Sequence, residues 1–214
     1  DANKRRGSNG KGRCLLAPKK RTPFASVVNS KSGWTLFWPK KGLTPWPLPV
    51  RTVEAHAPAK VNLTLHVTGL RQDGYHLLHS LVVFADISDR ISARPAKDLS
   101  LTVDGPFQAG VPTDGKNLVL RAAKALQQIS GVTTGAAIHL QKNLPHAAGI
   151  GSGSSDAAAT IRLLSDLWGV DVPPADHPAI LGLGADVPVC LAGPAPQEMS
   201  GIGEILRPTQ PLPN

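Results

Sequence analysis

The segment with the strongest chemical signal is a glycine- and serine-rich stretch at residues 145–156, with the sequence Pro-His-Ala-Ala-Gly-Ile-Gly-Ser-Gly-Ser-Ser-Asp. Its three glycines at alternate positions let the backbone approach a ligand closely and turn N–H groups toward it. Ser154, Ser155 and Asp156 are residue types that favour a helix N-cap, so we expect a helix over Asp156–Trp168. The unpaired N–H groups and the positive dipole end of such a helix attract anions. The pattern therefore predicts a phosphate-binding loop.

Two well-known phosphate-loop patterns do not fit this stretch. The Walker pattern needs Gly-Lys-Ser/Thr after its first glycine, and no lysine follows here. The Rossmann pattern needs G-x-G-x-x-G and an acidic residue about 20 positions further on, at the end of a second strand. Here the glycines follow G-x-G-x-G, and Asp171, the acid at that distance, is followed by two prolines. An ordinary glycine-rich turn before a helix is the simpler alternative.

Two charged residues elsewhere have settings that suit phosphoryl transfer, which needs positioning, charge stabilisation and an acceptor for the proton of the attacking hydroxyl. Asp186 lies in a Gly-Ala-Asp-Val-Pro turn between apolar stretches, where a carboxylate can be fixed and partly desolvated. Lys60 and Asn62 are two positions apart on a predicted strand and therefore share its polar face. Without further context, Asp186 is equally typical of a structural cap and Lys60 of a solvated strand face.

The elements around these residues mix strands and helices without a repeating strand–helix–strand order, which predicts an α+β fold. We expect ordered structure from about Arg51 onward. Over Lys60–Thr68, strict alternation predicts a strand with an apolar face formed by Val61, Leu63, Leu65 and Val67. A helix is expected over Asn117–Ile129, ending at Gly131. Further short strands are predicted at Leu77–Ile87, Ile91–Ala93, Leu99–Val103 and Ala136–Leu140.

Composition excludes several classes of protein. The 214 residues are 41% hydrophobic, enough for a core, but no apolar run reaches the roughly 18–20 residues of a membrane span, so we expect no membrane partner. The two cysteines, Cys14 and Cys190, exclude a disulfide scaffold. His76 and His79 are three positions apart on a predicted strand with no further ligand, so no zinc site is expected and no metal-ligating residue is assigned.

Residues 1–50 differ from the rest of the chain. They hold eleven lysines and arginines and one acid, whereas the remainder carries a net charge of −2. Because they show no sustained helical or strand period, we predict a disordered basic extension. Three origins stay open: a tail or upstream sequence outside the natural protein, a transit peptide, or a nucleic-acid arm. Since the excess positive charge is confined to this segment, no nucleic-acid partner is expected for the domain.

Five segments in order resemble the GHMP kinases, the superfamily of galactokinase, homoserine, mevalonate and phosphomevalonate kinases. Residues 145–156 resemble the second motif of that superfamily, and the sequence Ala-Pro-Ala-Lys-Val-Asn-Leu at 57–63 resembles the first. Three more segments are similar to those of the branch that phosphorylates 4-diphosphocytidyl-2-C-methyl-D-erythritol: Asp73–Leu77, Leu183–Val189 and Gly201–Leu206. One such segment alone is a weak signal, but order and spacing agree over about residues 54–208.

The resemblance implies a GHMP-kinase N-terminal domain of the ribosomal protein S5 domain 2-like fold over residues 51–208. Residues 209–214 would begin the C-terminal region, with most of the C-terminal domain absent. The second motif departs from the family at Ala147, Ala148 and Ser152, which stand where glycine is common. These are small residues that still permit close backbone approach. A third glycine-rich motif of the family is missing, so the activity of this chain by itself is an open point.

The resemblance also implies an activity: ATP-dependent phosphorylation of the 2-hydroxyl of 4-diphosphocytidyl-2-C-methyl-D-erythritol, a small-molecule substrate, in isoprenoid precursor biosynthesis. Asp186 would be the general base with Lys60 beside it, while Asn62, Tyr75 and His76 would bind the substrate. Mg²⁺ would accompany ATP. The residues implied to bind ATP are Pro145, His146, Ala147, Ala148, Gly149, Ile150, Gly151, Ser152, Gly153, Ser154 and Ser155.

Two alternatives to this activity remain. One is another GHMP small-molecule kinase, of the homoserine or mevalonate type, from which the Asp-Gly-Tyr-His sequence at 73–76 distinguishes the chain. The other is an inactive, truncated chain. The expected location is the cytoplasm, or a plastid if residues 1–50 are a transit peptide. Nothing in the sequence predicts an oligomeric state.

Overall fold

The structure, a computed structural model, describes residues 24–28, 35–39 and 51–209 of the chain. The chain divides into two compact units, Asp1–Leu48 and Pro49–Asn214. In the first unit, strand β1 (Phe24–Val28) pairs antiparallel with β2 (Thr35–Pro39). These two segments are rich in the aromatic and β-branched residues that favour strands, although the sequence shows no sustained strand period there. The disordered basic extension stays a prediction, because most of residues 1–50 lie outside the described residues.

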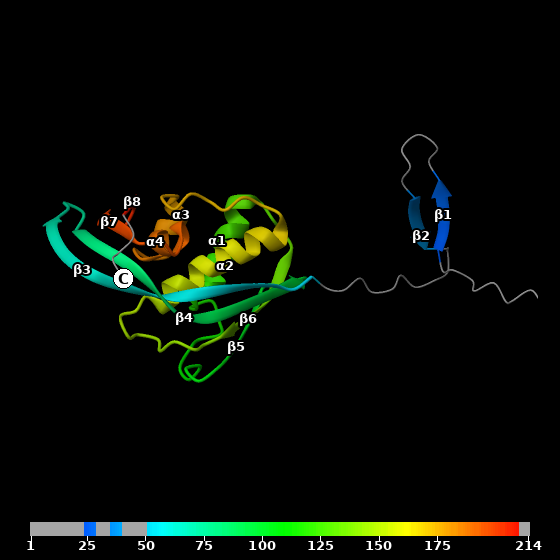
Figure 1. The fold of residues 1–214 in the computed structure, drawn as a ribbon, viewed down its shortest axis with the longest axis horizontal. Coiled ribbons are helices and arrows are strands. Elements are labelled where there is room, and N and C mark those ends of the chain that lie inside the picture. Colours follow the sequence, from blue (N-terminus) through cyan, green and yellow to red (C-terminus); the bar gives the residue numbers. More distant parts are fainter. Residues whose placement is uncertain (1–23, 29–34, 40–50, 210–214) are drawn as a thin grey trace, which may run out of the picture. The chain divides into compact units, whose positions relative to one another are not determined.

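The second unit is built on a six-stranded mixed sheet with the order β5-β6-β4-β7-β8, to which β3 adds by pairing with β4. Its strands are β3 (Val53–Leu70), β4 (His76–Ala96), β5 (Ser100–Asp104), β6 (Gly135–Gln141), β7 (Gln197–Gly201) and β8 (Ile205–Pro208). Only the β5–β6 pair is parallel among the described strands. The helices are α1 (Leu118–Ser130), α2 (Ser152–Trp168), α3 (Pro178–Leu181) and α4 (Val187–Ala192), gathered over one face of the sheet (Figure 1).

The core lies between α1, α2 and the covered face of the sheet. On α2, Ala157, Ala158 and Ala159 are fully buried, and small side chains there let the helix approach the sheet and α1 closely. Ile91 and Leu140 are among the sheet residues of the same buried cluster. This mixture of an antiparallel-rich sheet with helices on one side confirms the predicted α+β fold class.

Helix α1 forms where the sequence predicts it. The side chain of Asn117 caps its first turn by accepting a hydrogen bond from the backbone N–H of Val119. Gly131 ends it with a left-handed φ of 72°, and its N–H donates to the carbonyl of Gln127. Both helix boundaries therefore follow from local chemistry that is visible in the sequence.

The β3–β4 hairpin differs from its prediction. Its strands are longer than expected, and β4 joins two segments that were predicted as separate strands. Bulges interrupt the β3–β4 register, one of them between Asn62 and Thr64. Because Asn62 pairs with Val82 and Leu65 pairs with Ser80, Asn62 and Leu65 lie on the same face. The predicted strict alternation over 60–68 is wrong beyond Asn62.

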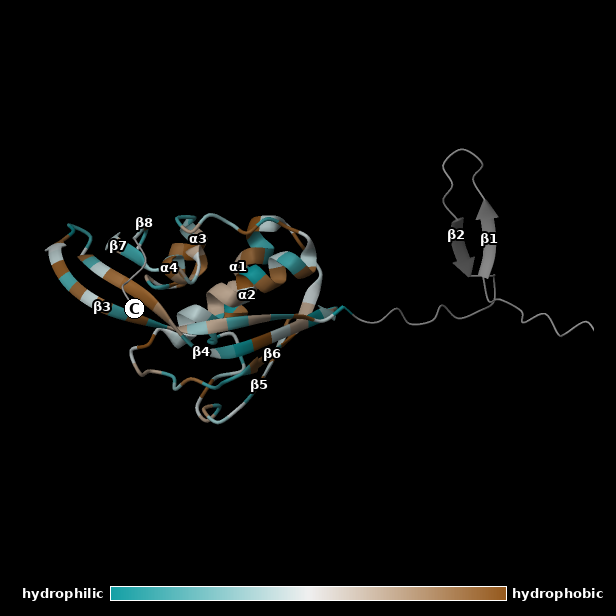
Figure 2. Ribbon diagram, in the orientation of Figure 1, coloured by the Kyte–Doolittle hydropathy of each residue, from teal (hydrophilic) through white to brown (hydrophobic). Residues whose placement is uncertain are grey.

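Hydrophobic residues lie along the part of the β3–β4 hairpin that extends past α2 (Figure 2), and several of them are exposed. Leu65 is 57% exposed and Val67 is 63% exposed. These residues were predicted to share one apolar face with Val61, but the bulge beside Asn62 places them on the face of Asn62, so that single face does not form. Elements after Trp168, namely α3, α4, β7 and β8, were not predicted. No helix in the described part of the chain is long and apolar enough to cross a membrane.

Candidate active site

Lys60 and Asp186 form an ion pair at the centre of the site. The Nζ atom of Lys60 lies 2.8 Å from Oδ1 of Asp186. The lysine side chain is only 3% exposed, whereas that of Asp186 is 34% exposed. Asp186 directly precedes α4, but its side chain makes no capping hydrogen bond to that helix. Its carboxylate is therefore held by the lysine and still open to solvent, as a group that exchanges a proton with a substrate must be.

A short hydrogen-bonded chain fixes the lysine. Lys60 Nζ donates to Oδ1 of Asn62 at 2.8 Å, and Nδ2 of Asn62 donates to the hydroxyl of Ser80 at 2.6 Å. The Ser80 hydroxyl in turn donates to the backbone carbonyl of Thr64 at 2.6 Å. The sequence placed Lys60 and Asn62 on one strand face, and the structure adds that Asn62 holds the ammonium group in position next to Asp186.

The glycine-rich segment leads into α2 earlier than predicted. The helix begins at Ser152, with Gly151 as its N-cap in a left-handed conformation (φ 61°), so Ser154, Ser155 and Asp156 lie inside the helix and are not its caps. The first helical hydrogen bond runs from the N–H of Ser155 to the carbonyl of Gly151 at 2.9 Å. The three N–H groups before it have no partner within the helix and are available to an anion.

The loop packs directly on the lysine strand. The backbone N–H of Lys60 donates to the carbonyl of Ile150 at 2.9 Å. A Cβ atom at Gly151 would lie 2.8 Å from Cε of Lys60. Glycine at 151 is thus required both by its positive φ and by this close approach.

Two neighbouring cavities border the loop. The first, called the loop cavity, has a volume of about 280 Å³, and its walls include residues 147–154 and Asp186. The second, called the α1–α2 cavity, has a volume of about 210 Å³ and lies between Asn117, Lys142 and Asp156. Both are bordered by Leu118 and by the first turn of α2. The loop cavity is therefore bordered by Asp186 and shares part of its wall with the α1–α2 cavity.

The members of the predicted ATP-binding segment differ in their access to these cavities. Ile150, Gly151 and Ser154 border the loop cavity, and His146 borders the α1–α2 cavity. Ser155 is 1% exposed and borders neither. Pro145 borders neither, but its carbonyl accepts a hydrogen bond from the Ser152 hydroxyl at 3.3 Å.

A buried ionic cluster that the sequence did not reveal lies beneath the α1–α2 cavity. Lys142 Nζ donates to Asp89 and, at 2.8 Å, to Oδ2 of Asp156, and all three side chains are almost fully buried. Asp89 also accepts the backbone N–H groups of Asn143 and Leu144. Oδ1 of Asp156 has no partner among the described residues. Burial raises the pKa of Asp156 to about 7, although Lys142 opposes the shift.

The two residues predicted to bind the cytidine end lie apart from the ion pair. Tyr75 is 60% exposed and His76 begins β4, both at the turn end of the β3–β4 hairpin. Lys60 pairs with Phe84, eight residues further along β4 than His76, which corresponds to about 26 Å of extended strand. The structure brings Lys60, Asn62, Asp186 and the loop together, and it leaves Tyr75 and His76 at the periphery of that group.

Within residues 51–209 no cluster of three or more His, Cys, Asp or Glu side chains is close enough to hold a metal ion. Mg²⁺ bound with a nucleotide takes most of its ligands from phosphates and water, so only a few protein oxygens are required. Ser154, on the wall of the loop cavity, carries a hydroxyl that can supply one of them.

Comparison with known proteins identifies the domain. Residues 117–194, which include α1, the loop, α2 and Asp186, match the family model described as GHMP kinases N terminal domain. This part of the chain is a GHMP kinase N-terminal domain. The predicted membership of that superfamily is therefore confirmed, and the described fold is the one that the five sequence segments implied.

Curated relatives of this GHMP domain carry a more specific name. A 4-diphosphocytidyl-2-C-methyl-D-erythritol kinase of Paramagnetospirillum magneticum is 59% identical over 159 residues, which cover 73% of this chain and 55% of the relative. The protein of the same name from Ruegeria pomeroyi is 57% identical over 161 residues, covering 75% of this chain and 55% of the relative. The chain thus spans about half the length of the curated relatives it matches.

Solved structures agree with this assignment. A crystal structure of 4-(cytidine 5′-diphospho)-2C-methyl-D-erythritol kinase superposes with a TM-score of 0.58 at 39% identity, covering 73% of this chain and 55% of that chain. A homoserine kinase from Cytophaga hutchinsonii gives a TM-score of 0.50 at 17% identity, covering 74% of this chain and 51% of that chain, and supports the fold alone. Among these names, the cytidine diphosphate branch is the one that also agrees in sequence.

Proposed function

We propose that this chain carries the general base and the phosphate-binding loop of an ATP-dependent kinase that phosphorylates the 2-hydroxyl of 4-diphosphocytidyl-2-C-methyl-D-erythritol. The observation that supports it most directly is the Lys60–Asp186 ion pair, 2.8 Å long, at the edge of the cavity formed by the glycine-rich loop. A proton acceptor and a phosphate-binding loop then border one space, which is the arrangement that transfer of a phosphoryl group to an alcohol requires.

The loop and α2 would bind the phosphates. Residues 152–154, whose N–H groups have no partner within the helix, border the loop cavity, and the helix dipole places partial positive charge there. Ser154 adds a hydroxyl. The adjoining α1–α2 cavity, bordered by Asn117 and Leu118, is the space into which the nucleoside end of ATP would extend. Mg²⁺, when bound, would neutralise phosphate charge.

Asp186 would act as the general base. Its partly exposed carboxylate accepts the proton of the substrate hydroxyl while the hydroxyl oxygen forms a bond to the γ-phosphorus of ATP and the bond from that phosphorus to the bridging oxygen of ADP breaks. Lys60 stabilises the carboxylate form of Asp186 and can contact the incoming oxygen. Asn62 would bind substrate or orient the ammonium group through its 2.8 Å hydrogen bond.

The choice of substrate is supported by the names of the relatives and by the Asp-Gly-Tyr-His sequence that resembles their branch. Tyr75 is exposed on the hairpin turn and offers a ring face to a cytosine. Next to it, His76 is also accessible and offers a polar contact. We expect no macromolecular partner for this reaction.

The test is substrate-dependent release of ADP by the purified protein, followed with 4-diphosphocytidyl-2-C-methyl-D-erythritol, homoserine and mevalonate as acceptors. The proposal predicts turnover with the first acceptor and none above background with the other two. A folded protein that binds ATP but phosphorylates homoserine or mevalonate, or that phosphorylates none of the three, would contradict it.

A further inference from the structure

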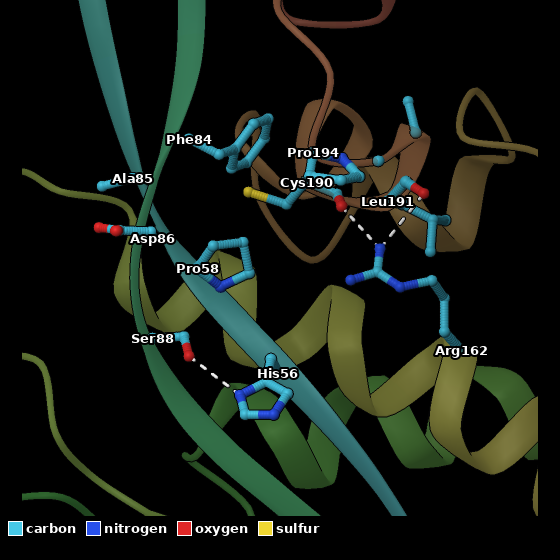
Figure 3. A pocket seen from close by; sticks show the side chains of 12 residues that line it. His56, Pro58, Phe84, Ala85, Asp86, Ser88, Arg162, Cys190, Leu191 and Pro194 are labelled. Carbon is cyan, nitrogen blue, oxygen red and sulfur yellow. Dashed lines mark hydrogen bonds between the residues drawn. The ribbon is translucent and has the colours of Figure 1, made fainter.

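A further cavity lies outside the candidate active site. Its volume is about 440 Å³, within the range of small-molecule sites, and it is bordered by β3, β4, α2 and the end of α4 (Figure 3). None of the residues that border it borders the loop cavity or the α1–α2 cavity. The phosphoryl-transfer chemistry proposed above uses no part of it.

Arg162 supplies a positive charge to this cavity. Its Nη1 donates to the backbone carbonyl of Cys190 at 2.7 Å and to that of Leu191 at 3.4 Å. Its Nε and Nη2 carry no hydrogen bond to any residue that the structure describes, and no carboxylate among them lies within ion-pair distance. Figure 3 shows one of the free nitrogens directed toward the space between Pro58 and His56. The free edge of a guanidinium group holds a carboxylate or phosphate through two parallel hydrogen bonds.

Other donors border the same cavity. His56 Nδ1 lies 3.1 Å from the hydroxyl of Ser88, and when that hydroxyl donates to Nδ1 the ring carries its hydrogen on Nε2, which can then donate to a ligand. The carboxylate of Asp86 points away from Arg162 and His56 in Figure 3, so it does not oppose an anion between them. The polar end of the cavity therefore offers hydrogen-bond donors together with one uncompensated cation.

The opposite wall is apolar. Phe84, Pro58 and Pro194 project their rings into the region beside the Cys190 side chain (Figure 3). Burial raises the pKa of the Cys190 thiol to about 12, so it stays neutral and adds no negative charge. A ligand that fits both ends carries an anionic group attached to a compact hydrophobic body.

We propose that this cavity binds a small organic anion, a carboxylate or phosphate attached to a ring or short hydrocarbon, with Arg162 holding the charged group and Phe84 and Pro58 contacting the apolar part. The site is separate from the ATP site but touches the same short helix: Arg162 bonds to carbonyls near the end of α4, and Asp186 precedes its start. The binding claim itself does not depend on the proposed kinase activity.

Benzoate and its uncharged analogue benzamide are the first probes. Titration of the full chain is followed by NMR through the methyl groups of Ala85 and Ala192 and the ring protons of His56, all on the cavity wall. We expect saturable shifts with benzoate at these three residues and at least ten-fold weaker binding of benzamide. Equal affinity for the two compounds would show that the negative charge does not contribute to binding, and would contradict the proposal.

Phenyl phosphate then distinguishes the two anions that the guanidinium edge accepts. Tighter binding than benzoate assigns a phosphate ester as the preferred ligand, and weaker binding assigns a carboxylate. Failure of both anions to bind would overturn the proposal.

Arg162→Met tests the charged contact, and Arg121→Met is its matched control. Arg121 lies on α1, donates to the carbonyl of Gly182 at 3.1 Å and does not border the cavity. We expect at least a ten-fold loss of benzoate affinity in Arg162→Met and none in Arg121→Met. Unchanged affinity in a folded Arg162→Met protein would refute the role of the arginine.

A second variant keeps the test decisive if Arg162→Met does not fold. Ala192 is exposed at the end of α4 and borders the cavity, so Ala192→Phe adds bulk there without removing a hydrogen bond of Arg162. Benzoate binding should be lost in a protein with native-like NMR spectra. Retained affinity would place benzoate elsewhere on the molecule and contradict the proposal.

Discussion

Gly151 and Lys60 lie so close together that a Cβ atom on the glycine would come within 2.8 Å of Cε and 3.1 Å of Cβ of the lysine. The loop that would hold the phosphates and the strand that carries the lysine are therefore one packed unit. A side chain at 151 must push Lys60 away from Asp186 or push the loop away from the strand. Either displacement disturbs the arrangement of Lys60, Asp186 and the glycine-rich loop.

We predict that Gly151→Ala weakens ATP binding by at least ten-fold, because the methyl group displaces the loop from Lys60. The measurement is a titration with ATP followed by calorimetry. Gly169→Ala is the matched control: Gly169 has a similar φ of 67° at the end of α2, but a Cβ atom added there would meet nothing within 4 Å. It should lose about 1 kcal/mol of stability and keep its ATP affinity. Equal loss of affinity in both variants would assign the effect to backbone strain alone.

Asp186→Asn keeps the size of the side chain but removes the proton acceptor. If Asp186 is the base, turnover should fall by about 10²–10⁴-fold while ATP affinity changes little, because the interaction is made mainly in the transition state. Steady-state kinetics and ATP titration measure the two quantities. Asp166→Asn serves as control, since Asp166 lies on α2, 62% exposed and paired with Arg51. Near-normal turnover in a folded Asp186→Asn protein would require another base.

Lys60→Ala should also lower turnover, since the ammonium group stabilises the carboxylate form of Asp186. It removes the buried cation that lies 2.8 Å from the carboxylate and holds it in place, so Asp186 is no longer fixed beside the substrate hydroxyl. Steady-state kinetics and a titration with ATP measure turnover and nucleotide affinity separately. Unchanged turnover in a folded Lys60→Ala protein would contradict the role of the ammonium group.

The parts of this structure that sequence predicts well are those fixed by local chemistry. Asn117 and Gly131 mark the ends of α1 because a side-chain cap and a left-handed glycine act within a few residues. Lys60, Asp186 and the loop were found through residue types and motif order, although they lie far apart along the chain. The resemblance to a known family indicated that these residues belong to one site. Their spacing along the chain alone did not.

The parts that sequence missed depend on contacts between distant segments. The Lys142–Asp89–Asp156 cluster joins residues that are 53 and 14 positions apart, and no periodicity connects them. The bulge beside Asn62 is set by the pairing of β3 with β4, so alternation along one strand could not reveal it. Helix α2 begins at Ser152, earlier than predicted, because Gly151 in its left-handed conformation turns the chain before the serines that resemble helix caps.

The division of the chain at Leu48 and Pro49 leads to a prediction about the basic segment. Limited proteolysis should cut before about Arg51 and leave a stable core that binds ATP with unchanged affinity, because every residue of the candidate site follows that position. Mass spectrometry of the core and a titration with ATP are the measurements. Loss of ATP binding on removal of residues 1–50 would show that the segment contributes to the site.

Asp156 should give the fold a specific pH dependence. Burial raises its pKa from 3.8 to about 7 in the folded protein, so the folded state binds a proton more tightly than the unfolded state does. The sign follows from linkage: the contribution of this group to stability is fully present below about pH 3.8 and is lost as pH rises through about 7. An ionised Asp156 at alkaline pH leaves Oδ1 buried without a partner among the described residues.

Asp156→Asn removes this titration while its amide oxygen can still accept the hydrogen bond from Lys142. Urea unfolding at several pH values between 4 and 8 should therefore show the variant gaining stability relative to the unmodified protein as pH rises across that window. Asp166→Asn, at an exposed position on the same helix, should show no such trend. A difference between Asp156→Asn and the unmodified protein that stays constant with pH would mean that Asp156 ionises normally, and the lone acceptor Oδ1 would then need a donor from the α1–α2 cavity that it borders.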